Sequence, residues 1–154
     1  MIGLGNPIMG DDGFGLAVLR RVQERWQVPS DVELLDGGTW GMQLLPLIEG
    51  ARRVLVLDAI DAGASPGTLV VLEGADLPGY FSHKLSPHQI DLREVLGLAA
   101  LRGTLPHELV AIGAQPERIE LCAELSPALA DRVDEIAEQA VARLLDWGHR
   151  CQSV

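Results

Sequence analysis

Short β-rich segments alternate with helical patterns along this chain, and that alternation restricts the fold more than any other feature. The apolar runs Met1–Gly5, Val32–Leu35 and Val54–Leu57 have the composition of strands, and the last two stop at an aspartate followed by small residues. Helical patterns lie between them. The order predicts an α/β fold: a single-domain three-layer sandwich, in which a mostly parallel, twisted sheet of about five strands carries helices on both faces.

Four segments have helical patterns. In the first, apolar residues recur at i, i+3, i+4, i+7 and i+11 and line one face. The last begins at Ser126–Pro127, with serine as the expected cap and proline at the first helical position. The predicted helices are Gly15–Trp26, Met42–Ile48, Pro87–Leu101 and the segment from Ser126, whose apolar stripe is Leu129, Val133, Ile136, Ala137, Ala140, Val141, Leu144 and Leu145.

Three further strands complete the prediction. Thr68–Leu72 follows the Pro66–Gly67 turn and lies too close to Val54–Leu57 for a crossover helix, so we expect a hairpin-like antiparallel addition to that strand. Leu109–Gly113 and Arg118–Leu121 have the pattern of two short strands.

Length and cysteine content indicate one soluble domain. A chain of 154 residues buries a core without disulfides or structural metals. We expect this domain over residues 1–147 and a flexible tail over 148–154. The two cysteines form no disulfide framework, no apolar run reaches the ~18–20 residues of a membrane span, and no signal peptide follows Met1, so a cytoplasmic protein is expected.

The charge balance excludes one class of partner. Acidic residues number 22 and basic residues 12, which gives a formal net charge of −10 and a field that repels phosphate backbones. The arginines occur singly or in pairs and form no basic patch along the sequence. We expect no nucleic-acid partner and no membrane partner.

Two aspartates stand where predicted strands end. Asp12 follows the first strand and its glycine-rich loop, and Asp58 comes directly after Val54–Leu57. In open α/β sheets, functional groups gather at the carboxyl ends of the strands. Asp36, which ends Val32–Leu35, is expected to point into the same crevice without being a primary ligand.

A histidine completes the candidate site. Ser86-Pro87-His88-Gln89 has the form of a capping box, which puts His88 in the first turn of a helix. There the positive end of the helix dipole keeps the imidazole neutral and able to bind a metal. Two carboxylates and an imidazole suit nickel or zinc and leave coordination positions open. Asp12, Asp58 and His88 are therefore the candidate ligands, and a plain surface position is the alternative for His88.

Other marked residues have simpler interpretations. Asp11 is expected to cap the first helix, and His83 and His107 to be solvated loop residues. The glycine-rich loop lacks the third glycine of a dinucleotide site, and no G-x-S-x-G, H-E-x-x-H or Walker motif is present. Nucleotide-binding, serine-hydrolase and zincin functions are disfavoured.

Six motifs follow one another along the chain: GLGNPIMGDDGFG, LLDGGTWGMQLL, VLVLDAIDAGASPGT, KLSPHQIDLREVL, IGAQPE and ELSP. In this order and spacing, up to about Leu145, they resemble the hydrogenase maturation endopeptidase family. The resemblance implies cleavage of a C-terminal extension from the [NiFe]-hydrogenase large-subunit precursor after nickel insertion. It implies that nickel presented by the substrate binds at Asp12, Asp58 and His88, a site that other divalent ions can also occupy. It further implies a role in substrate recognition for Asp36, Gly37, Gly38 and Thr39.

The chain departs from the family pattern at two points. Almost nothing precedes Gly3, where family members carry several apolar residues, so the position of the native start is open. Asp12 stands where glutamate is frequent, and its shorter side chain shifts the expected metal position.

Two other functions stay open. Peptidyl-tRNA hydrolase has a similar strand and G-L-G-N-P loop, but its histidine-asparagine segment is missing here and the negative charge disfavours tRNA. A non-enzymatic nickel-binding or chaperone module is the third possibility. The sequence also leaves open whether nickel is only a recognition handle or polarises the scissile carbonyl as well.

Overall fold

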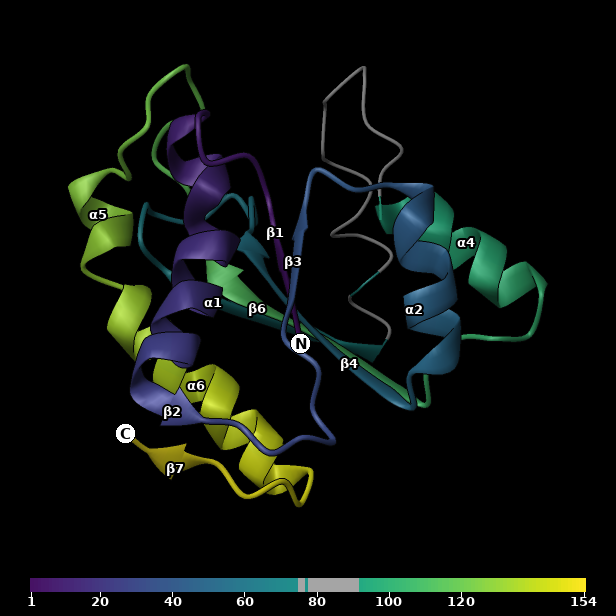
Figure 1. Ribbon diagram of the computed structural model, residues 1–154. Coiled ribbons are helices and arrows are strands. Elements are labelled where there is room, and N and C mark those ends of the chain that lie inside the picture. Colours follow the sequence, from purple (N-terminus) through teal and green to yellow (C-terminus); the bar gives the residue numbers. More distant parts are fainter. Residues whose placement is uncertain (75–76, 78–91) are drawn as a thin grey trace.

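A five-stranded sheet forms the centre of the computed structural model, which describes residues 1–74, 77 and 92–154 (Figure 1). Its strand order is β3-β1-β4-β6-β5. The first four of these strands pair in parallel and β5 joins antiparallel, as the sequence predicts for a mostly parallel sheet. The strands are β1 (Ile2–Leu4), β3 (Leu35–Gly38), β4 (Arg53–Ala59), β5 (Leu69–Glu73) and β6 (Glu108–Ala114).

Helices cover both faces of the sheet and make the three layers predicted from the sequence (Figure 1). Two short 3-10 helices, η1 (Gly10–Gly13) and η2 (Met42–Leu44), lead into the first helix of each layer. One layer holds α1 (Phe14–Arg25), α5 (Pro127–Ala130) and α6 (Val133–Asp146), and the other holds α2 (Leu45–Gly50) and α4 (Leu92–Leu101).

The central strand β4 divides the core into two apolar clusters. Val54 and Val56 pack on the side of α2 and α4, whereas Leu55 and Leu57 pack on the side of α1 and α6. This is the period of two expected of a strand buried on both faces. The same alternation directs Asp58 toward the side covered by α2 and α4.

Glycine at two positions lets α1 lie directly on the sheet. A Cβ at Gly15 would come within 2.1 Å of the Leu57 carbonyl oxygen and 2.6 Å of the Leu4 carbonyl oxygen. A Cβ at Gly3 would come within 2.8 Å of the Gly15 carbonyl oxygen. The start of α1, and η1 before it, are therefore held against the carboxyl ends of β1 and β4.

The position of β5 corrects one prediction. The strand is antiparallel, as expected, but it pairs with β6 rather than with the segment Val54–Leu57. Both edges of β4 are already occupied by β1 and β6, so the outer edge of β6 is the place left for an added strand. Asp36 and Asp58 also lie inside β3 and β4, not after them.

Two predictions for the C-terminal third are wrong. The segment Arg118–Leu121 is no strand, because backbone groups at its start bond to the Asp11 carboxylate and to the η1 region instead of a sheet edge. The last helix begins at Pro127 as predicted but is divided into α5 and α6, and the Ser126 side chain does not cap it. Its predicted stripe is buried except for Leu145, which is 51% exposed.

The final residues, predicted as a loose tail, instead contain a short strand, β7 (Gln152–Ser153). It pairs antiparallel with β2 (Trp26–Gln27), which follows α1 directly. The Val154 N–H also donates to the Arg25 carbonyl at 2.9 Å. The backbone of this segment therefore has hydrogen-bond partners in β2, which its polar sequence does not predict.

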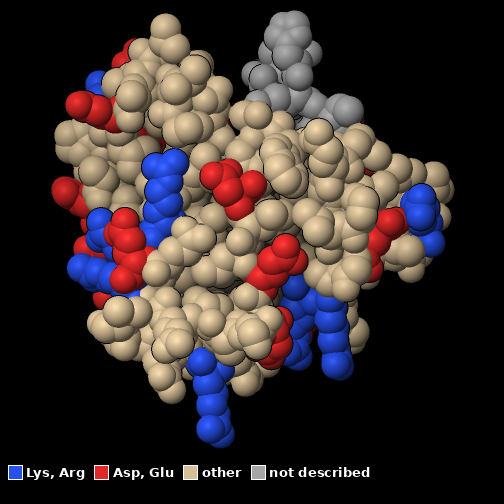
Figure 2. All heavy atoms as spheres, in the orientation of Figure 1, with Lys and Arg blue, Asp and Glu red and all other residues tan. Residues whose placement is uncertain are grey.

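Arginines of the described residues mostly stand beside acids, and Figure 2 shows the two charges interspersed on one face. This distribution is consistent with the sequence, in which the arginines occur singly or in pairs. Within the described ranges, none of the helices is long and apolar enough to cross a membrane. The arginines with acidic partners are Arg21, Arg25, Arg53, Arg102, Arg118, Arg132 and Arg143.

Candidate functional site

The strand order reverses between β1 and β4, and this is where the two candidate acids lie. From β1 the chain passes to β3 on one side, and from β3 it crosses back to β4 on the other side (Figure 1). Ligands of open α/β sheets bind in the crevice at such a switch point, outside the carboxyl ends of the strands. Asp12 follows β1 and Asp58 is the penultimate residue of β4, so both lie near this switch point.

A tight loop fixes the Asp12 carboxylate. The Asn6 N–H donates to Asp12 Oδ2 at 2.9 Å, and the Asn6 side chain accepts from the Ile8 N–H at 3.2 Å. Gly5 has φ +116°, and a Cβ there would lie 1.7 Å from the Asp12 carbonyl oxygen. Only glycine fits this close approach, so the first motif holds Asp12 half-buried at the sheet edge.

Asp58 is almost completely buried, with 1% of its surface exposed. It is in register with Gly113 on β6, where a Cβ would come within 1.9 Å of the Asp58 carbonyl oxygen. Burying a polar side chain is costly unless hydrogen-bond donors or cations lie close to it. Asp58 therefore lies buried near the carboxyl end of the central strand.

The loop that follows β4 is ordered by the buried side chain of Gln115. Gln115 Oε1 accepts from the N–H groups of Ala62 at 2.8 Å and Ala64 at 3.1 Å, and Nε2 donates to Asp61 Oδ1 at 3.0 Å. One amide thus fixes the backbone beyond Asp58 against the end of β6. Gln115 belongs to the IGAQPE motif, and this contact is a structural reason for a glutamine there.

Asp11, next to the candidate ligand, has a different role from the helix cap that we predicted. It is fully buried, and its carboxylate accepts hydrogen bonds of 2.7–3.0 Å from the N–H groups of Glu117, Arg118 and Ser126 and from the Ser126 hydroxyl. Burial by itself raises the pKa of Asp11, but these hydrogen bonds together outweigh it and hold the pKa below its ordinary value. Asp11 therefore anchors the segment between β6 and α5 to η1.

Asp36 lies on the opposite side of its sheet from Asp58. Leu35 and Gly37 face the α2 and α4 side, so the pleat directs Asp36 to the other side, where it is exposed. Its Oδ1 is 3.3 Å from where a Cβ of Gly38 would be, so the carboxylate leans toward the carboxyl end of β3. That Asp36 faces the same crevice as Asp58 stays a prediction.

His88 and His83 lie outside the described residues. His107 is exposed at the start of β6, as predicted. Within residues 1–74, 77 and 92–154, no group of three or more histidine, cysteine or acidic side chains is arranged to hold a metal. A ligand set of Asp12, Asp58 and His88 therefore stays a prediction.

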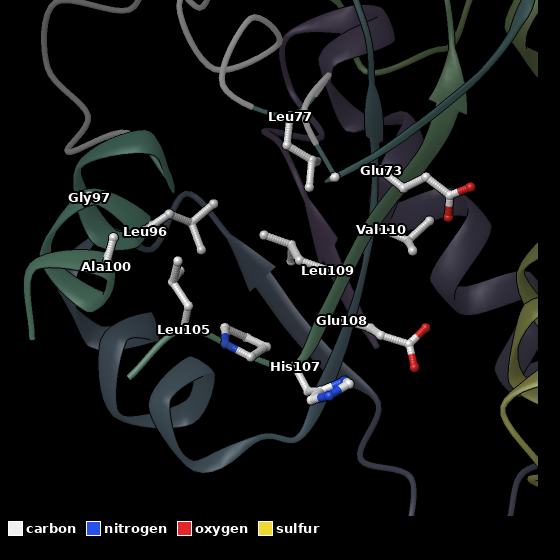
Figure 3. Close-up of a pocket in the computed structure, with 12 residues that line it drawn as sticks. Glu73, Leu77, Leu96, Gly97, Ala100, Leu105, His107, Glu108, Leu109 and Val110 are labelled. Atoms are coloured by element: carbon white, nitrogen blue, oxygen red, sulfur yellow. The ribbon is translucent and has the colours of Figure 1, made fainter. Parts of the chain in front are cut away.

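A pocket of about 620 Å³ lies away from these acids, between α4 and the β5–β6 edge. In Figure 3 Leu96, Leu105 and Leu109 point toward it, whereas Glu73 and Glu108 point away. Both glutamates form ion pairs on the other side of the sheet. The pocket is thus lined mainly by apolar side chains near the amino end of β6 and is not part of the carboxylate crevice.

Two acids at the switch point of a mostly parallel sheet define an α/β protein with a candidate site at the carboxyl edge. Comparison with known proteins makes the class specific: the chain belongs to the hydrogenase maturation protease family, whose model matches residues 16–143. It is therefore a hydrogenase maturation endopeptidase, and this decides among the three functions that the sequence left open.

Relatives and solved structures agree. The hydrogenase expression/formation protein HupD of Rhodobacter capsulatus is 39% identical over 96% of this chain and 71% of its own length. The hydrogenase 2 maturation protease of Escherichia coli is 33% identical over 96% of this chain and 91% of its own. The structure of the E. coli maturating endopeptidase HybD matches with a TM-score of 0.92 and 32% identity, covering 99% of this chain and 94% of HybD.

Proposed function

We propose that this enzyme removes the C-terminal extension of a [NiFe]-hydrogenase large-subunit precursor after nickel insertion. The names of similar proteins support a hydrogenase substrate: one solved relative, from Thermococcus kodakarensis, is called a [NiFe] hydrogenase maturation protease, with a TM-score of 0.72 and 29% identity over 94% of this chain and 90% of its own. Both cysteines are free thiols, which accords with a reducing compartment, and we place the processing in the cytoplasm.

The observation that carries the proposal is the pair of acids at the switch point. Asp12 is held by a backbone N–H at the end of β1, and Asp58 is buried at the end of β4. The donors of the proposed set, two carboxylate oxygens and one imidazole nitrogen from His88, suit Ni²⁺. In the sequence, His88 precedes by four residues the start of α4, the helix that covers the side of the sheet toward which Asp58 points.

The segment Asp36–Thr39 is proposed to contact the substrate beside this site. Asp36 and Thr39 are exposed, and Gly38 has φ +43°, so the chain turns outward at the carboxyl end of β3. An exposed carboxylate here adds a charge that attracts a nickel-bearing surface without being buried itself.

Two chemical roles for the substrate nickel give different kinetics. If nickel is only a recognition handle, loss of a ligand raises KM and leaves kcat nearly unchanged. If nickel also polarises the scissile carbonyl or lowers the pKa of an attacking water, kcat falls as well. The kinetics of the ligand variants therefore separate the two roles.

The test uses purified enzyme with nickel-loaded and nickel-free precursor, without added nucleotide or metal, and resolves the large subunit by mass. We expect the enzyme to cleave the nickel-loaded precursor alone. In the variants His88→Ala and Asp58→Asn, we expect the rate of this cleavage to fall by orders of magnitude. His107→Ala, at an exposed histidine at the amino end of β6, is the matched control and keeps full activity. Equal trimming of both precursor forms, or full activity of His88→Ala, would refute recognition through nickel.

A further inference from the structure

Exposed apolar side chains gather on the loops at the carboxyl edge of the sheet. Ile8 is 56% exposed, Ile119 54% and Leu121 81%. Ile8 belongs to the β1–η1 loop, and the other two belong to the segment between β6 and α5. The two loops pair backbone to backbone: the Cys122 N–H donates to the Ile8 carbonyl at 3.0 Å, and the Gly10 N–H donates to the Cys122 carbonyl at 2.6 Å. We call Ile8, Ile119 and Leu121 the loop platform.

The backbone under the loop platform is held in one shape. The Asp11 carboxylate accepts from two consecutive N–H groups, of Glu117 and Arg118, and the Asp11 N–H donates to the Arg118 carbonyl at 3.1 Å. A Cβ at Gly10 would lie 3.2 Å from that same carbonyl oxygen. A surface ordered in advance loses little conformational entropy when a partner binds to it.

Single exposed apolar residues are common, but three on paired and anchored loops are not explained by the fold. They contribute nothing to the two core clusters, and each remains about half or more exposed. Exposed apolar side chains grouped on ordered, neighbouring loops are typical of a contact with another protein. The loop that carries Ile8 is also the loop whose Asn6 N–H holds the Asp12 carboxylate, so the platform shares this loop with the candidate site.

We propose that the loop platform is a docking surface for the folded body of the hydrogenase precursor, through an apolar patch on that protein. The inference rests on the proposed function, in which the substrate is a hydrogenase large subunit that reaches the enzyme with its nickel already inserted. Specific protein complexes bury about 800 Å² on each partner, far more than three metal ligands provide. The platform would supply apolar contact area from the loop that also positions Asp12 and from the loop paired with it.

The test compares a platform variant with a control at an exposed leucine outside the platform. Ile119→Ser/Leu121→Ser removes two platform side chains, and Leu101→Ser removes a leucine that is 86% exposed at the end of α4. With nickel-loaded precursor, we expect the platform variant to raise KM by roughly tenfold or more and to keep kcat within about twofold, since buried apolar contacts are lost from the complex alone. The control keeps both constants, and circular dichroism verifies that both variants are folded.

Failures of the two proposals differ in this experiment. If the platform variant has the same KM as Leu101→Ser, the docking proposal is overturned. This holds whether or not the wild-type enzyme cleaves nickel-free precursor. Wild-type enzyme that trims both precursor forms equally overturns nickel recognition, while the KM ratio of the variant still decides on docking. Sedimentation velocity tests whether the platform instead binds a second copy of this chain. If the wild-type enzyme is a dimer, and the platform variant is a monomer with an unchanged KM, the proposal is also overturned.

Discussion

Replacing Asp11 by asparagine tests the claim that one buried carboxylate anchors the segment between β6 and α5. The substitution keeps the shape of the side chain but leaves one acceptor oxygen in place of two. If the amide oxygen takes the place of Oδ2, it still accepts from Glu117, Arg118 and the Ser126 hydroxyl. The amide NH₂ then faces the Ser126 N–H, a donor that loses its acceptor.

The expected cost follows from these contacts. A hydrogen bond to a charged group contributes about 1.5–3 kcal/mol and a neutral one about 0.5–1.5 kcal/mol, so each bond that Asp11→Asn keeps is weakened. The stranded N–H of Ser126, a fully buried residue, costs about 1–3 kcal/mol more. Because bonds to one acceptor are not additive, we expect a loss of about 3 kcal/mol in the free energy of unfolding. For a chain of this size that lowers Tm by about 6–12 °C.

Urea denaturation measures this loss, with Ser126→Ala as the matched control that removes one of the four donors and costs about 1–2 kcal/mol. The folded-state pKa of Asp11 lies below its unfolded value, so its stabilisation is complete above the unfolded pKa and disappears as pH falls through the folded pKa. The difference between wild type and Asp11→Asn should be constant above about pH 5 and shrink below about pH 4. A variant within about 0.5 kcal/mol of wild type at neutral pH would refute the anchor.

Three further predictions concern other sites. Asp36→Asn should reduce precursor processing several-fold without changing Tm, because the carboxylate is exposed; an unchanged processing rate would make the segment structural. Gly15→Ala should lower the free energy of unfolding, measured by urea denaturation, by more than about 2 kcal/mol, because its Cβ would lie 2.1 Å from a β4 carbonyl oxygen. In Gly97→Ala, in α4, the Cβ would have no atom within 4 Å, and the substitution should raise that free energy by up to about 1 kcal/mol. Burial raises the pKa of the Cys151 thiol, so in a Cys122→Ser variant alkylation at about pH 8 should be slower in folded than in unfolded protein; equal rates would contradict this.

The sheet could be predicted from the sequence because its strands are dense in β-branched and aliphatic residues. Val54–Leu57 and Leu109–Gly113 both lie within the strands observed. The partner of β5 could not be predicted, since its apolar pattern is equally compatible with an edge of β4 or of β6. Arg118–Leu121 has a strand-like composition, but a distant carboxylate, that of Asp11, takes up the backbone N–H groups at its start. Long-range hydrogen bonds of this kind leave no local pattern.

The placement of two candidate acids could also be predicted, whereas their role as metal ligands stays a prediction. Asp12 and Asp58 stand out because strand ends are visible in the sequence and the carboxyl edge of a parallel sheet is shared. Asp11 and Asp12 are adjacent and chemically identical, and no local pattern shows which one the fold buries. The difference lies in residues more than a hundred positions away, which form the donors around Asp11.

The place of β4 at the middle of the sheet affects how the chain folds while it is being synthesised. Val56 pairs with Ile2 on one side and with Ala111 on the other. The strand β1 is synthesised before β4, whereas β6 is synthesised about fifty residues later, so one edge of β4 stays unpaired until then. Until the ribosome has released residues 108–114, the growing chain has an apolar strand with an open edge, which is a surface that chaperones bind and other chains pair with. Nascent chains arrested before Glu108 should therefore associate or bind chaperones more readily than chains arrested beyond Asp146.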